Sequence, residues 1–161
     1  MHAHAKNGKI VIIGTNNGPE SLPGLVFSIW ERDMFYFSPE RLVIGEASPG
    51  YDQRLKSDAS NLPNVIQALQ SDRTDLFDRL VIHLREIFST VGNLTARLAP
   101  SELVEIRVWP TQDRKFVDLS FPLKESGTGV AQAIAILTAI MTVENAVIII
   151  DEINSFLHPS A

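Results

Sequence analysis

Two adjacent acids follow an apolar run near the end of the sequence. Asp151 and Glu152 come directly after Val147–Ile150, four β-branched residues that favour a β-strand. An unbroken apolar run predicts a central strand buried on both faces, and carboxylates at its tip are costly to desolvate unless a cation compensates them. We expect Asp151 to hold Mg²⁺ and Glu152 to polarise a water molecule that attacks a phosphate. The alternative is a strand that surfaces into an acidic turn.

A second pattern lies 25 residues before Asp151. Two glycines alternate with two hydroxyl residues in Ser126, Gly127, Thr128 and Gly129, directly before an apolar helix. Such a turn exposes backbone N–H groups, and the positive end of the helix points at the same place. The turn therefore predicts an anion-binding cradle; the alternative is a plain helix start behind a flexible turn.

The elements that position these residues are predicted from hydrophobic periodicity. Val130–Met141 is apolar on nearly every side, which indicates a helix inside a larger body. Two amphipathic helices are expected between Asn61 and Val91, with apolar residues at helical spacing. Leu103–Trp109 alternates as a strand, and Lys115–Leu123 is expected to return as the second strand of a hairpin.

The first forty residues carry weaker signals. Lys9–Gly14 reads as a buried strand, which we expect in the same sheet as Ala146–Ile150. Val26–Phe37 is rich in aromatic and β-branched residues and predicts one or two strands. We expect both tryptophans, Trp30 and Trp109, to be packing residues.

Along the chain, the Gly-rich turn, the apolar helix and the strand that ends in two acids follow one another. This order resembles AAA-type ATPases with ABC/SMC-like heads, relatives of the overcoming-lysogenization-defect and RecF-like proteins. Ser126–Gly129 with Gln132 resembles their signature motif, and Val147–Glu152 resembles Walker B. The likeness extends from about Phe35 to the C-terminus, with Ile153–Pro159 at the place of the D-loop. The resemblance implies a head that dimerises around ATP and Mg²⁺, in which the signature turn contacts the γ-phosphate held by the partner's P-loop.

The sequence departs from that family in three respects. Ile153 stands where a proline usually follows the two acids, and His158 does not match the switch histidine. The third departure is the Walker A motif: Gly14–Ser21 begins like a P-loop, but Pro19 replaces the second glycine and Glu20 replaces the lysine. We therefore expect the P-loop to be supplied by upstream sequence that this chain lacks, as in a fragment or a split-gene product.

Composition narrows the remaining possibilities. The 161 residues carry a net charge of −5, which argues against a basic nucleic-acid-binding domain. There are no cysteines, so thiolate sites are excluded and the cytoplasm is the expected compartment. No apolar run approaches the roughly 20 residues that span a bilayer.

Together these observations predict one α/β domain over residues 1–161, an incomplete head like that of the P-loop NTPases. We expect a mixed sheet with a buried helix, a two-helix arm at residues 61–91 and a signature and Walker B lobe at residues 103–161. The expected function is ATP binding and hydrolysis in a homodimer or with a partner ATPase subunit. The isolated chain is expected to be inactive, and the alternative is a non-catalytic protein-interaction module.

Overall fold

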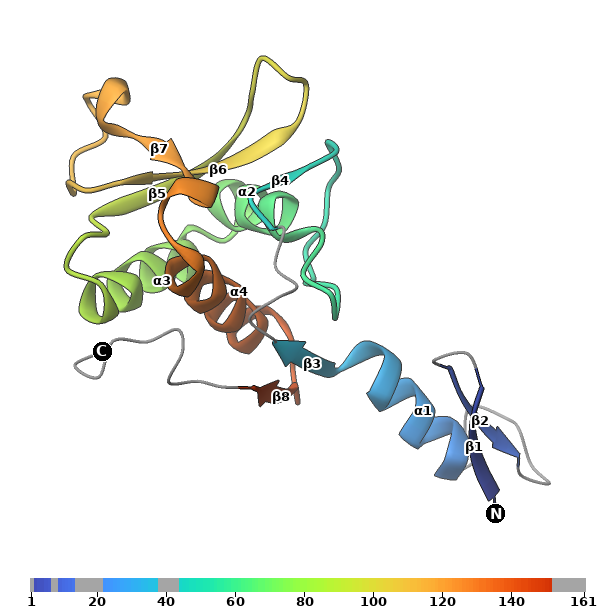
Figure 1. The fold of residues 1–161 in the computed structure, drawn as a ribbon. Helices are drawn as coiled ribbons and strands as arrows, with labels where there is room; N and C mark the ends of the chain where they lie inside the picture. Colours follow the sequence, from blue (N-terminus) through green and yellow to red (C-terminus); the bar gives the residue numbers. More distant parts are fainter. Residues whose placement is uncertain (1, 7–8, 14–21, 38–43, 152–161) are drawn as a thin grey trace.

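A computed structural model describes residues 2–6, 9–13, 22–37 and 44–151 (Figure 1). The described part of the chain is a mixed α/β structure with helices packed against small sheets. Its elements in chain order are β1 (His2–Lys6), β2 (Lys9–Ile13), α1 (Leu22–Arg32), β3 (Met34–Phe37), β4 (Glu46–Ala47), α2 (Leu62–Asp72), α3 (Thr74–Ile87), β5 (Asn93–Leu98), β6 (Val104–Trp109), η1 (Val117–Leu119), β7 (Phe121–Pro122), η2 (Leu123–Glu125), α4 (Thr128–Thr142) and β8 (Val147–Ile150).

The largest sheet is antiparallel and centres on β6, which confirms the strand predicted at Leu103–Trp109. Its neighbours are β4 and β5, and the short β7 also pairs with β6. Alternation along β6 places Val104, Ile106 and Val108 in the core. The opposite side carries Glu105, which accepts hydrogen bonds from Arg97 and Arg107. One face of the sheet is therefore apolar and the other carries an ion-pair network.

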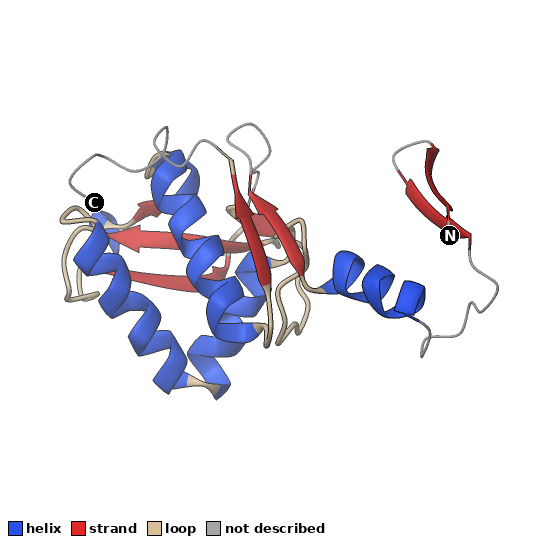
Figure 2. Cartoon of the chain, turned by 90° about the horizontal axis from the view of Figure 1, so that it is seen from below, coloured by secondary structure: helices blue, strands red, loops and turns tan. Residues whose placement is uncertain are grey.

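The helices cover the apolar face of this sheet, as Figures 1 and 2 show. Both helices predicted between Asn61 and Val91 are confirmed as α2 and α3. Their apolar stripes are buried in the same core as the sheet, so they do not stand apart as an arm. Amphipathic helices of this length are stabilised mainly by such packing, and this is why they lie against the sheet.

The predicted buried helix is confirmed as α4, with one difference. Ile134, Thr138 and Ala139 are fully buried, yet Ile140 is 58% exposed. The apolar character of α4 therefore extends onto a side that the described residues leave uncovered.

Three predictions for the strands are wrong. Lys9–Ile13 forms β2, which pairs with β1 in a separate antiparallel hairpin and not with β8. The strand β8 pairs in parallel with β3 and is only half buried, since its residues alternate between exposed and partly buried. Within residues 115–123 only β7 pairs with β6, because residues 115–119 form an exposed segment that includes η1.

The prediction of one or two strands within Val26–Phe37 is confirmed for one strand, β3 at Met34–Phe37. Helix α1, which occupies residues 22–32, was not predicted from the sequence. Val26 and Trp30 lie four residues apart and share one side of the helix, a spacing that the aromatic and β-branched composition obscured. Figure 1 shows α1 extending from β3 towards the N-terminal hairpin, away from the main body.

Candidate functional site

The turn predicted at Ser126–Gly129 is the entrance to α4. Ser126 directly follows η2. Its backbone N–H and its hydroxyl both donate to the Leu123 carbonyl, at 3.0 and 2.6 Å. Gly127 has a φ of 90°, a conformation that glycine adopts without strain. A Cβ built on Gly127 would meet no atom within 4 Å, so the space beside this residue is open.

The first turn of α4 has no local compensation for its positive end. Thr128 is its first residue, the turn contains no acidic residue, and Gly127 provides no side-chain cap. The backbone N–H groups at the start of a helix have no partner within the helix, and the helix dipole adds positive potential there. The exposed Glu125 precedes the turn and reduces that potential. The arrangement can therefore bind an anion, although a neighbouring carboxylate weakens it.

Gln132 lies one turn further along α4 and is 2% exposed. Neither its Oε1 nor its Nε2 has a hydrogen-bond partner among the described residues. Gln132 lies on the first turns of α4, and helical side chains lean in general towards the N-terminus, where the Ser126–Gly129 turn lies. A buried amide without partners costs free energy, and native proteins retain such groups mostly where a ligand, water or function uses them.

Asp151 lies at the tip of β8 and is exposed. Its backbone N–H donates to the Phe37 carbonyl at 3.0 Å, which continues the parallel pairing with β3. Its Oδ2 accepts a hydrogen bond from the Tyr36 hydroxyl at 2.9 Å. Sequence reasoning missed Tyr36, and no local signal could have found it, because the contact joins residues 115 positions apart.

The other candidate residues divide between the described and the undescribed parts of the chain. Glu152 and the P-loop-like segment Gly14–Ser21 lie outside the described residues. Within the described ranges, no three histidine or acidic residues cluster as a metal site would require. Asp151 thus offers a single carboxylate among the described residues, and a Mg²⁺ ion there would need its remaining ligands from water and phosphate oxygens.

The turn and Asp151 occupy different places around α4. From the turn, α4 runs for about 22 Å, and β8 then returns over about 13 Å. Figure 2 shows the tip of β8 on the side of the start of α4, whereas Figure 1 shows the two well separated.

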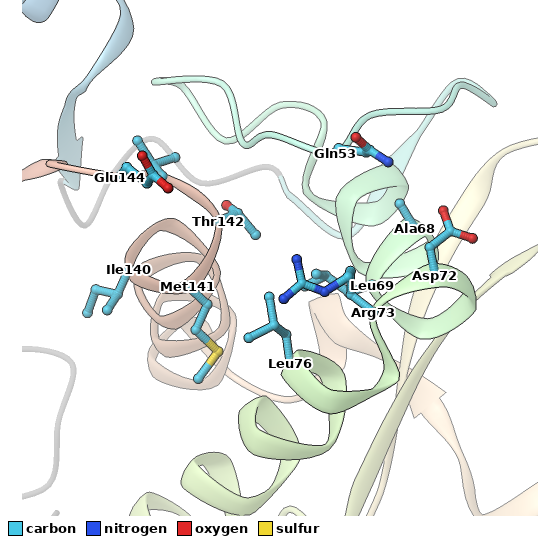
Figure 3. Close-up of a pocket in the computed structure, with 11 residues that line it drawn as sticks. Gln53, Ala68, Leu69, Asp72, Arg73, Leu76, Ile140, Met141, Thr142 and Glu144 are labelled. Atoms are coloured by element: carbon cyan, nitrogen blue, oxygen red, sulfur yellow. The ribbon is translucent and has the colours of Figure 1, made fainter.

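A hollow of about 640 Å³ lies near the other end of α4, against the junction of α2 and α3 (Figure 3). Leu69, Leu76 and Met141 form apolar parts of its lining, and Arg73 extends between them. Hydrogen bonds from Arg73 hold the pKa of Asp75 below its ordinary value of 3.8. This hollow contains neither the turn nor Asp151, so it is separate from the candidate residues.

The two tryptophans differ. Trp109 is buried, which confirms it as a packing residue, whereas Trp30 is 51% exposed, so a packing role for Trp30 stays a prediction.

No protein family, curated protein or solved structure matches the chain. None of the helices in the described residues is long and apolar enough to cross a membrane.

Proposed function

We propose that the chain binds ATP with Mg²⁺ as the signature and Walker B side of an ABC/SMC-like ATPase head. In this proposal the Ser126–Gly129 turn receives the γ-phosphate of a nucleotide held by a P-loop on another polypeptide, at a dimer interface. The observation that carries the proposal is the uncapped start of α4, with the buried and unpartnered Gln132 one turn inside it. Phosphate is a good ligand for such a place because it accepts several hydrogen bonds and carries negative charge.

The separation of the turn from Asp151 speaks against one site in which both hold the same nucleotide, as the adjacent motifs led us to expect; the proposal therefore rests on the dimer that the resemblance implies, in which each acts on a different nucleotide. A signature turn acts on the nucleotide of the partner head, whereas a Walker B acid acts on the nucleotide of its own head. We assign Asp151 to the metal and Glu152 to the attacking water, as the sequence predicts. Mg²⁺, when bound, neutralises charge on the phosphates.

The experiment compares two equivalent helix starts. Thr128 and Thr74 are the exposed first residues of α4 and α3, so Thr128→Asp and Thr74→Asp place the same charge at the same helical position. We expect the purified chain to bind ATP weakly, on the order of 1 mM by calorimetry with Mg²⁺. Thr128→Asp should weaken binding about tenfold, and Thr74→Asp should not change it. Equal effects of the two variants would refute the site.

Two further variants locate the ligand. Gln132→Leu preserves the shape of the side chain and removes the unpartnered amide, so it should stabilise the fold while weakening ATP binding. Glu125→Gln removes the repelling charge and should strengthen binding. Hydrolysis by the isolated chain should be negligible; robust turnover that is lost in Glu152→Gln would show that the P-loop assignment is wrong.

A second candidate function is a non-catalytic interaction module. The exposed apolar side chains on α1 and on the β3–β8 pair favour it, because exposed apolar patches mark interaction surfaces. Absence of any ATP binding, together with stable association, would favour this alternative.

A further inference from the structure

The helix α1 presents apolar side chains that the described residues of the chain leave exposed. Val26, Phe27 and Trp30 are 50%, 41% and 51% exposed. Residues 26 and 30 are one helical turn apart and residue 27 lies beside them, so the three form one apolar face. Figures 1 and 2 both show α1 extending away from the packed core.

The β3–β8 pair also has a face that the described part of the chain leaves exposed. Tyr36 pairs with Ile149, and Met34 pairs with Val147, so these four side chains point to the same side of the sheet. Tyr36, Val147 and Ile149 are 41% to 50% exposed, while Phe35 and Phe37 on the other side are buried. Parallel strands are normally covered on both faces, usually by helices. The missing cover is therefore expected to be a helix with an apolar face.

The chain's own α1 cannot provide that cover. Only Asp33 separates α1 from β3, and connections that fold a helix back onto its sheet need about two to six residues. Asp33 is also fixed in place: its carbonyl accepts from the Val147 N–H at 2.8 Å, and its carboxylate pairs with Arg54. Helix α1 is thus directed away from the β3–β8 face, although β3 follows α1 directly in the sequence.

We propose that α1 of one copy of the chain covers the β3–β8 face of a second copy, in a reciprocal exchange. The lengths agree, since α1 spans about 16 Å and each strand about 13 Å. Reciprocity buries the contact twice, which favours a stable dimer because a stable interface needs roughly 1,000 Å² in total. This exchange needs no nucleotide, although the covered face includes Tyr36, whose hydroxyl donates to Asp151 of the proposed ATP site.

The first test is the oligomeric state, measured by light scattering and sedimentation without nucleotide. The unmodified chain should be a dimer at about 100 µM. Trp30→Glu changes the helix and Ile149→Lys changes the face, and each should raise the dimer dissociation constant at least about tenfold. Leu119→Glu is the matched control: Leu119 is 47% exposed in η1, far from both surfaces in sequence, and this variant should remain dimeric.

Mixing the two variants distinguishes exchange from general stickiness. A mixture of Trp30→Glu and Ile149→Lys retains one intact contact, between α1 of the second variant and the face of the first. The mixture should therefore associate more tightly than either variant alone. Failure to recover association in the mixture would overturn the reciprocal arrangement.

Cross-linking provides a measurement that does not depend on removing apolar side chains. Because the chain has no cysteine, Val26→Cys with Val147→Cys introduces one thiol on α1 and one on the β3–β8 face, and peptide mapping distinguishes a disulfide between positions 26 and 147 from disulfides between identical positions. Oxidation should yield a covalent dimer. A disulfide within one chain would show that α1 covers its own sheet, and an unmodified chain that remains monomeric at about 100 µM would show that another partner covers the face; either result overturns the proposal.

Discussion

The strands β6 and β8 are built from similar residues and have different surroundings. Both are rich in valine and isoleucine, and both alternate between two faces. In β6 the apolar face lies under the helices and the other face carries Glu105 with its arginine partners. In β8, Val147 and Ile149 face outwards with no charged side chain among them. Burial therefore depends on what covers a strand. In β6, helices cover the apolar face and arginines pair with the acid on the other face, and both come from the same chain.

The largest expected effect comes from truncating the covered strand. Ile106 is fully buried in β6, so Ile106→Ala should lower the free energy of unfolding by about 2–5 kcal/mol, through lost burial and the cavity that remains. Urea denaturation followed by circular dichroism measures this. A loss below about 1 kcal/mol would mean that β6 is not the centre of the core.

The polar face of β6 should give the next largest effect. Arg107 donates to Glu105 and to the Ser120 hydroxyl, and Glu105 is 8% exposed. Arg107→Met should lower the free energy of unfolding by about 1–3 kcal/mol, because Glu105 loses one of two cationic partners. Arg97→Met is the control: this arginine is more exposed, so its loss should cost less than about 1 kcal/mol. The reverse order would show that the network depends on Arg97.

A smaller effect is expected on the uncovered strand. Ile149→Ala should change the free energy of unfolding by less than about 1 kcal/mol, because much of the side chain is already in water. The measurement is the same denaturation, at protein concentrations low enough to keep the chain monomeric. A loss as large as that of Ile106→Ala would show that β8 is covered in solution even in the monomer.

The smallest effect concerns Asp58, in the loop that leads into α2. Burial raises the pKa of Asp58, but hydrogen bonds from the Ser60 N–H and hydroxyl outweigh it and hold the pKa below 3.8. The ionised carboxylate thus adds stability above pH 3.8, and this is lost as pH falls through the lower folded pKa. Ser60→Ala should raise the Asp58 pKa, measured by NMR titration, and an unchanged pKa would contradict the role of the hydroxyl.

Local patterns in the sequence predicted the helices α2, α3 and α4, the strand β6 and the turn before α4. Each of these depends on periodicity or on glycine within a short window, and neighbouring residues in the chain are sufficient to produce it. The sequence also identified Ser126–Gly129 and Asp151 as candidates, because glycine, hydroxyl and carboxylate groups suggest phosphate or metal binding from their residue types alone. The proposal of an ATP site therefore derives from the sequence.

Tertiary structure decided the rest. The parallel pairing of β3 with β8 joins residues more than 110 positions apart, and it places Tyr36 on Asp151. The tertiary structure also determines that Ile149 faces outwards while Ile106 is buried, although both are isoleucines within strands. Residue type sets how much free energy burial would release, but only the arrangement of distant segments decides which face is covered. For the same reason the separation of the turn from Asp151 could not be predicted from their spacing along the chain.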